Sequence, residues 1–157
     1  MRWLLLFWLL DLAAPPPTLV NDDSWIGRAE IVDGDTIRIN GSRLRLLDID
    51  AFEMAQNCTD LKGKEYACGL EAARALGDLI GGQDVRCYGR ERDRYRRPLV
   101  NCWAGQTDLN LQMVQIGWAV AEYSRNYQVD EALARRAKVG AWAGTFERPR
   151  EWRRRRD

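Results

Sequence analysis

Acidic side chains that could hold a metal ion lie close together in one short stretch of the sequence: Asp33, Asp35, Asp48, Asp50 and Glu53. Carboxylates that meet at one end of a sheet form a site for a hard cation such as Ca²⁺ or Mg²⁺. Arginines occur at positions 43 and 45 and at five positions from 90 to 97, and a guanidinium group binds phosphate oxygens in pairs. Together these groups predict attack on a phosphoryl centre. Any one of the charges could simply face solvent, so the prediction depends on their combination.

The amino-acid composition excludes several kinds of catalytic site. The chain has 157 residues, with 24 Lys and Arg, 23 Asp and Glu, 4 Cys and no His. This length predicts one domain with a core large enough to fold alone. The lack of His excludes Ser-His-Asp and Cys-His machinery, and it excludes imidazole as a base or metal ligand. Acid–base work therefore falls to carboxylates, Lys or Tyr. The formal net charge of +1 indicates no class of partner.

Short strands are expected to carry the acidic group. Asp33-Gly34 separates two apolar runs and suits the turn of a hairpin, and Asn40-Gly41 forms a second turn. A third strand is predicted over 43–50. Because side chains alternate along a strand, Arg45 and Asp50 would lie on opposite faces. If both serve one site, this strand must end or curl between them.

The rest of the pattern alternates helices and strands. Apolar residues at helical spacing predict a helix from about 66 to 80, ended by Gly81-Gly82. Strands are expected at about 84–90 and 97–103. Asp108 can cap a helix that stops at Gly117, and a last helix spans about 129–139. This order predicts an α+β fold, and five short strands match an OB-fold barrel.

The four cysteines predict two disulfides. Their spacings of ten, nineteen and fifteen residues lack the close pairs typical of zinc sites. Of the three possible connectivities we prefer Cys58–Cys68, which closes a short polar loop, and Cys87–Cys102, which lie on two strands of one hairpin. Such bridges form in an oxidising compartment. The alternative is four free buried thiols in a cytosolic protein.

The N-terminus indicates export. Residues 3–10 are eight apolar residues after Arg2, which is typical of a signal peptide and too short to span a bilayer. We therefore expect a signal peptide or short apolar segment over 1–14, a Pro-rich linker over 15–24, one domain over 25–148 and an Arg-rich tail over 149–157. A basic run of this kind is most often a solvated end, and it could also attract phosphate.

Four motifs in order resemble those of the staphylococcal nuclease-like, or thermonuclease, family: residues 32–37, 45–53, 93–97 and 117–119. The resemblance covers roughly residues 25 to 148. It implies a five-stranded OB-fold barrel with three helices, in agreement with the strand count above. It also implies a Ca²⁺-dependent nuclease that acts on DNA and RNA, and many members are exported.

The resemblance also assigns roles to single residues. Asp35 and Asp50 correspond to the Ca²⁺ carboxylates, and the carbonyl of Ala51 is a further expected ligand. Glu53 corresponds to the residue that orients or deprotonates the attacking water, and Arg45 and Arg97 correspond to the pair that binds the scissile phosphate. Tyr95 and Tyr123 fall where the family has aromatic residues that contact the nucleotide, although a core position is an equal alternative.

Two positions depart from the family pattern. Phe52 replaces a proline before the glutamate, which removes a backbone constraint that helps to aim Glu53. Arg96 replaces a glycine before Arg97, which adds positive charge. Asp48 is an additional carboxylate, expected to face water.

These observations predict an exported nuclease, secreted or periplasmic, or tethered by an uncleaved N-terminus. It would hydrolyse DNA, RNA or both as a monomer, with no protein partner evident. The alternative is a noncatalytic OB-fold module that binds nucleic acid or protein. A disulfide-stapled structural domain would explain the cysteines but not the charges.

Overall fold

A computed structural model describes residues 22–157 of the chain. The predicted signal segment and most of the Pro-rich linker therefore lie outside the described residues. The ordered elements extend from Asp23 to Arg154, beyond the predicted domain bounds of 25–148 on both sides. Within the described part, no helix is long and apolar enough to cross a membrane.

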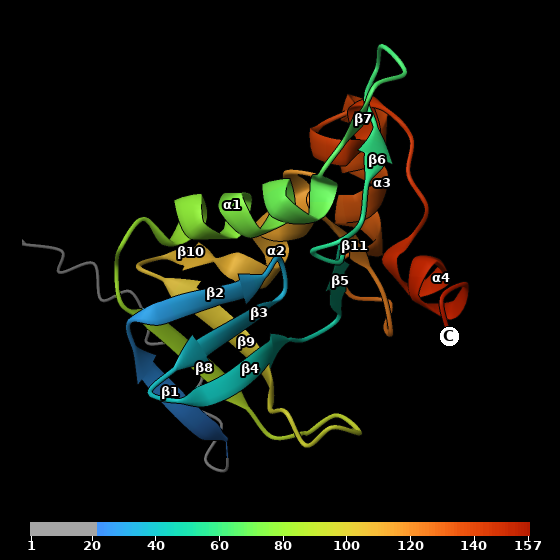
Figure 1. Ribbon diagram of the computed structural model, residues 1–157. Coiled ribbons are helices and arrows are strands. Elements are labelled where there is room, and N and C mark those ends of the chain that lie inside the picture. The colour runs from blue at the N-terminus through green and yellow to red at the C-terminus, as the bar shows by residue number, and fades with distance from the viewer. Residues whose placement is uncertain (1–21) are drawn as a thin grey trace, which may run out of the picture.

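The centre of the fold is a strongly bent, mostly antiparallel sheet with helices on one side (Figure 1). Its strands follow the order β1-β8-β9-β4-β3-β2, and β10 adds to β9. Their bounds are β1 Asp23–Gly27, β2 Ala29–Asp33, β3 Thr36–Ile39, β4 Ser42–Leu46, β8 Val85–Gly89, β9 Leu99–Ala104 and β10 Thr107–Asp108. The predicted α+β, OB-type architecture is confirmed.

The barrel differs from the prediction in how it closes. Strands β1 and β2 are separated by the single residue Arg28, so one stretch of chain pairs with β8 at one edge and with β3 at the other. The path of paired strands starts at β1 and ends at β2, and among the described residues no ladder pairs these two strands, so the sheet is not closed. Its seven strands exceed the five expected, because β1 and β2 count separately on either side of the bend and the short strand β10 adds to β9.

Helix α1, Cys68–Ile80, forms because small and apolar residues recur on one face. The buried residues Cys68, Ala72, Leu76 and Ile80 are spaced by four, and Gly81 ends the helix with a positive φ of 59°. The helix packs on β2 and on α2, Leu109–Gln115. Asp108 caps α2 as predicted, since its side chain accepts a hydrogen bond from the Leu111 amide at 3.0 Å.

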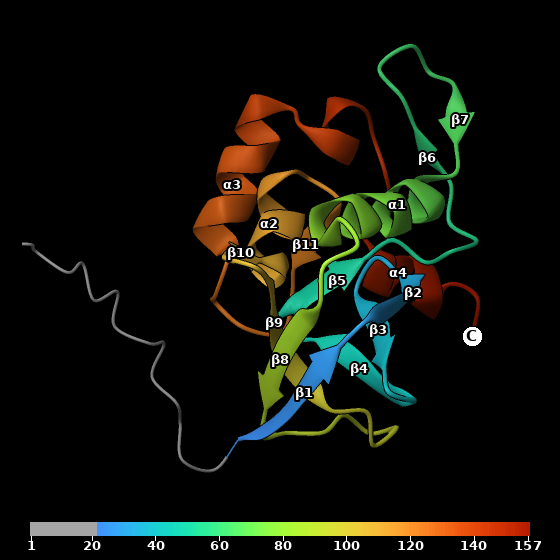
Figure 2. The same ribbon diagram turned by 90° about the vertical axis from the view of Figure 1, so that its left-hand side faces the viewer.

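Two further short sheets and two helices complete the fold. Strand β5, Ile49–Ala51, pairs with β11, Ala119–Ala121, and β6, Cys58–Thr59, pairs with β7, Glu65–Tyr66. Helix α3, Gln128–Ala137, packs against α2, and a 3₁₀ turn follows at Gly140–Ala143 (Figure 2). The C-terminal residues form a helix, α4, Pro149–Arg154, packed near β5. The predicted basic tail is thus a docked helix.

Both predicted disulfides are confirmed. Cys58 and Cys68 are bonded and join β6 to the start of α1. Cys87 and Cys102 are bonded and face each other in the β8–β9 register. The second bridge therefore lies within the β8–β9 ladder, one residue pair before its end at the loop over residues 90–98.

Candidate active site

The predicted strand over 43–50 is interrupted. Strand β4 ends at Leu46, Asp48 adopts a positive φ of 64°, and β5 starts at Ile49 as part of another sheet. The Arg45 side chain can then turn toward β5, where its Nη1 donates to the carbonyl of Leu46 at 2.9 Å and to that of Ile49 at 3.0 Å. The condition for Arg45 and Asp50 to share one site is therefore met.

Two buried carboxylates flank Arg45. Asp35 is 6% exposed and Asp50 is 1% exposed. The shortest N–O distance from Arg45 to each carboxylate is 3.4 Å. Asp35 comes from the β2–β3 turn, and its Oδ2 accepts a hydrogen bond from the Ala51 amide at 2.7 Å. The β2–β3 turn and strand β5 thus bring both carboxylates to the same guanidinium.

This convergence needs Gly34. A Cβ atom built on Gly34 would lie 2.7 Å from the Cβ of Ala51 and 2.8 Å from that of Ala72. A side chain there would push the β2–β3 turn away from β5 and α1. The Asp-Gly pair that predicts a hairpin turn therefore also brings Asp35 beside β5.

The negative charge of Asp35 helps to raise the pKa of two neighbouring carboxyl groups. Burial raises the pKa of Asp50 to about 6, the negative charge of Asp35 contributes, and hydrogen bonds from Arg153 oppose the shift. Burial and the neighbouring Asp35 likewise raise the pKa of Asp33 to about 7. Closely spaced buried carboxylates of this kind carry negative charge that a cation would stabilise.

Glu53 follows β5 at the edge of the same region. Its amide donates to the side chain of Gln56 at 3.2 Å, and the Gln56 amide donates to the Glu53 carbonyl at 2.8 Å. Phe52 is 1% exposed and packs edge-on against Phe146, with ring centroids 4.9 Å apart. Burial of Phe52 therefore anchors the backbone where the family pattern has proline.

The start of α1 also supports this loop. A Cβ atom on Gly69 would lie 1.8 Å from the Glu53 carbonyl oxygen. Gly69 is thus needed for the close approach of the helix to the backbone of Glu53.

Arg97 comes from the loop that joins β8 and β9. Asp93 holds it, since the Arg97 Nε donates to the Asp93 carboxylate at 2.7 Å and the Arg97 amide donates at 2.9 Å. Burial would raise the pKa of Asp93, but these bonds from Arg97 outweigh it and lower the pKa below its ordinary value. Arg96 has a positive φ of 66°, so it keeps the backbone form that a glycine would favour.

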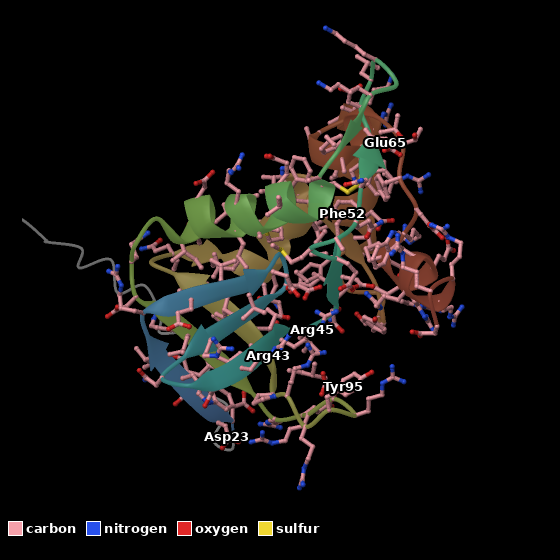
Figure 3. All side chains as sticks on the ribbon, viewed as in Figure 1. Asp23, Arg43, Arg45, Phe52, Glu65 and Tyr95 are labelled. Carbon is pink, nitrogen blue, oxygen red and sulfur yellow. A yellow bond between two sulfur atoms is a disulfide. The ribbon has the colours of Figure 1, made fainter. Side chains whose placement is uncertain are left out.

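Most of the predicted site residues line one open cavity of about 880 Å³. It is lined by seven of them: Asp35, Arg45, Asp50, Glu53, Tyr95, Arg97 and Tyr123. Figure 3 shows Arg45 on β4 and Tyr95 on the β8–β9 loop on the same side of the barrel. Ala51 is buried and contributes its amide to Asp35. The role of its carbonyl stays a prediction.

The two tyrosines are surface residues. Tyr95 is 64% exposed and Tyr123 is 60% exposed, so the alternative of a core position is wrong for both. The guanidinium of Arg97 lies 5.6 Å from the ring centroid of Tyr95. Asp48 also lines the cavity rather than only facing water, and it accepts a hydrogen bond from Asn126 at 2.8 Å.

Sequence reasoning missed one residue of the site, Arg153 on α4. Its Nη1 lies 3.0 Å from Asp50 Oδ1 and 2.6 Å from Glu53 Oε1, and its Nη2 lies 2.9 Å from Asp50 Oδ2. Burial opposes the charge of Arg153, but the hydrogen bond to Asp50 raises its pKa further above the ordinary value. The only signal in the sequence was the basic run, which does not indicate which arginine turns inward.

The oxygen donors suit a hard divalent cation. Asp35 and Asp50 offer carboxylate oxygens, which Ca²⁺ and Mg²⁺ prefer over nitrogen or sulfur. Across residues 22–157, however, no three His, Cys, Asp or Glu side chains are arranged as a metal site. The two carboxylates would therefore need backbone or water oxygens to complete a coordination shell.

The fold and site define an OB-type domain with a carboxylate–arginine centre. The "Staphylococcal nuclease homologue" family matches residues 43–144, about two thirds of the chain, and the protein belongs to this family. The matched region contains Arg45, Asp50, Glu53 and Arg97. Asp35 and Arg153 lie outside it.

Three relatives share this similarity. The "Succinoglycan biosynthesis protein ExoI" of Rhizobium meliloti is 37% identical over 74% of this chain and 64% of its own length. An "Uncharacterized endonuclease" of Haemophilus influenzae is 31% identical over 80% of this chain and 70% of its own. The "Probable endonuclease LCL3" of Pyricularia oryzae is 35% identical over 71% of this chain and 48% of its own. The chain thus spans about half to two thirds of the length of two of these relatives and slightly more than two thirds of the third.

Proposed function

We propose that the protein is a Ca²⁺-dependent nuclease that hydrolyses phosphodiester bonds of DNA, RNA or both. The observation that carries this proposal is one cavity lined by Arg45, Glu53 and Arg97 beside the carboxylates Asp35 and Asp50. A module that only binds nucleic acid has no need of buried carboxylates next to phosphate-binding arginines. Two relatives are named as endonucleases, which favours the same activity.

Arg45 would stabilise the charge that develops on the phosphoryl oxygens. Its Nη1 is held by two backbone carbonyls, so the guanidinium is oriented before substrate arrives. A donor fixed in this way costs no reorganisation during reaction, which makes it effective in the transition state. Arg97, which lines the same cavity, would bind a second phosphate oxygen.

Glu53 would hold and deprotonate the attacking water. Its side chain is 32% exposed, so water can reach the carboxylate while the backbone stays anchored. A bound divalent cation would supply Lewis-acid stabilisation of the phosphoryl oxygens, with Asp35 and Asp50 as the protein ligands. The choice of Ca²⁺ follows the resemblance of the motifs.

The substrate would enter along the exposed tyrosines. Stacking of bases on aromatic rings tolerates any sequence, which suits a nuclease without base preference. Tyr95 and Tyr123 lie at the edge of the cavity and are open to solvent.

We also propose that the protein is exported to the periplasm or the exterior. The two disulfides support an oxidising compartment.

Cleavage assays on Glu53→Gln test the proposal. Purified protein is incubated with labelled single- and double-stranded DNA and RNA, with Ca²⁺ or with chelator. We expect cleavage only with Ca²⁺, and we expect kcat to fall by about 10²–10⁴ in the variant, the usual range for loss of a general base. Nucleic-acid binding should persist because an anion has been removed. Glu71→Gln, at a half-exposed position of α1 that does not line the cavity, is the matched control.

Two results would decide against this assignment. Tight nucleic-acid binding by the wild type without cleavage would favour the noncatalytic binding module. Full kcat in Glu53→Gln would remove the role given to Glu53 and leave the nuclease activity itself intact.

A further inference from the structure

Arg153 occupies the oxygens that a metal ion would use. One guanidinium bonds both oxygens of Asp50 and one oxygen of Glu53, at 3.0, 2.9 and 2.6 Å. The Tyr123 hydroxyl is a fourth partner, at 3.1 Å. The side chain thus places a positive charge directly between the predicted metal ligand and the predicted base.

The docking of helix α4 sets this position through contacts of its own. Arg148, just before the helix, pairs with Glu131 at 2.9 Å and donates to the Ala121 carbonyl at 3.1 Å. Arg150, on the helix itself, pairs with Glu122 at 3.4 Å. Since these contacts join the helix to other parts of the fold without Arg153, the helix can stay docked when the Arg153 side chain moves.

Arg45 and Arg153 differ in how easily each could leave Asp50. The Arg45 side chain is 10% exposed and bonded to two backbone carbonyls. The Arg153 side chain is 34% exposed, lines the cavity, and its hydrogen bonds go only to side chains. Of the two, Arg153 is the exchangeable partner.

We propose that Arg153 competes with the divalent cation for Asp50 and Glu53, so that α4 restrains the site until a cation displaces this side chain. The inference rests on the proposed cation site. Asp50 is 1% exposed, and its two oxygens already accept bonds from Arg153. A cation that binds Asp50 must therefore break charge-assisted hydrogen bonds, which are about twice as strong as neutral ones. The same contact keeps Glu53 from serving as a base.

Calorimetric titration of Ca²⁺ and of Mg²⁺ into metal-free protein tests this competition. We compare the wild type with Arg153→Gln, which removes the charge but keeps a polar side chain. The matched control is Arg154→Gln, which removes an equal charge from the same helix. Among the described residues, Arg154 forms no ion pair. Arg153→Gln should lower the Kd for the cation by about tenfold, because no strong hydrogen bond to a charged group has to be broken. Arg154→Gln should change it by less than about threefold.

Thermal unfolding supplies a readout that needs no activity. In chelator, Arg153→Gln should lower the Tm because the buried Asp50 loses a partner. Saturating Ca²⁺ should then raise its Tm by more than it raises that of the wild type.

The outcomes separate this inference from the proposed function. A Kd in Arg153→Gln that equals or exceeds the wild-type value overturns the competition and leaves the nuclease proposal in place. An unchanged Tm in chelator overturns it as well, since the pair would then not stabilise the protein. If none of the three proteins binds either cation, the cation site itself is absent and the proposed Ca²⁺ dependence fails with it.

Discussion

Two arginines line the same cavity but are held in different ways. Arg45 is buried on β4, and its guanidinium is bonded to backbone carbonyls and flanked by two buried carboxylates. Arg97 lies in the β8–β9 loop, and its partner Asp93 is four residues away in the same loop. The first arginine is positioned by the tertiary fold, and the second by a local turn.

The two arginines should therefore differ in how much they contribute to the stability of the fold, although both line the site of the proposed reaction. Removal of Arg45 leaves the buried Asp35 without its charge partner and leaves Asp50 with Arg153 alone, which affects folding as well as any reaction. Removal of Arg97 breaks a partly exposed pair within one loop, which contributes little to stability. Both should matter for phosphate binding, but only one belongs to the structural core.

The largest expected effect is that of Arg45→Ala. We expect it to lower the free energy of unfolding by about 3–5 kcal/mol, the usual cost of breaking a buried ion pair. Arg97→Ala should cost less than about 1 kcal/mol. Both should lower kcat by about 10²–10³, as expected for loss of a fixed donor. Urea unfolding in chelator and steady-state cleavage measure the two effects.

Equal losses of stability in the two variants would contradict the comparison. Arg97→Lys sharpens it, because an ammonium group cannot make the paired phosphate contact. We expect Arg97→Lys to be folded as well as the wild type and to cleave as poorly as Arg97→Ala.

The next effect concerns the disulfide below the Arg97 loop. Replacing Cys87 and Cys102 with Ala should lower the free energy of unfolding by about 2–4 kcal/mol. We expect kcat to fall by less than about tenfold under folding conditions, because Asp93 rather than the bridge holds Arg97. Unfolding curves and cleavage rates of the double variant measure both quantities.

The other disulfide is the matched control. Cys58 and Cys68 are 10 residues apart and Cys87 and Cys102 are 15 apart, so the chain-entropy account gives a slightly smaller loss for the first pair. A collapse of kcat only when Cys87 and Cys102 are removed would show that the bridge, and not the local turn, positions Arg97.

The smallest effect is expected for Asp93→Asn. The amide can still accept the backbone hydrogen bonds of the loop through its oxygen, but it loses the charge that pairs with Arg97. We expect kcat/KM to fall by about tenfold or less, with stability unchanged within about 0.5 kcal/mol. A loss as large as that of Arg97→Ala would mean that Asp93 itself contributes to the reaction.

Local signals predicted most of the elements. Asp108 capping α2, Gly81 ending α1 and the Asn40-Gly41 turn all act through neighbours in the sequence, and the predicted Asp33-Gly34 turn lies one residue later, at Gly34-Asp35. The disulfide pairing could also be predicted, because Cys87 and Cys102 occupy opposite positions of one hairpin. Such features depend on a few adjacent residues, so a pattern suffices to find them.

Features that depend on segments far apart in the sequence were harder to predict from the sequence. The bend between β1 and β2 lets one stretch serve two edges of the sheet, and strand propensity alone does not reveal it. Arg153 lies 103 residues from Asp50 in the sequence, and it is one of four consecutive arginines. Its role depends on how α4 docks.

The sequence by itself determined which charged groups the protein has, where its turns and helix ends fall, and which cysteines pair. Turn formation, helix capping and side-chain periodicity depend on residues that are close together in the sequence. These features can therefore be predicted without knowledge of the rest of the fold. Only the tertiary structure decided that Arg45 turns toward Asp35 and Asp50, that Phe52 anchors Glu53 by burial, and that Arg153 bonds Asp50 and Glu53. Those arrangements come from long-range packing and from the need of buried charges to be paired.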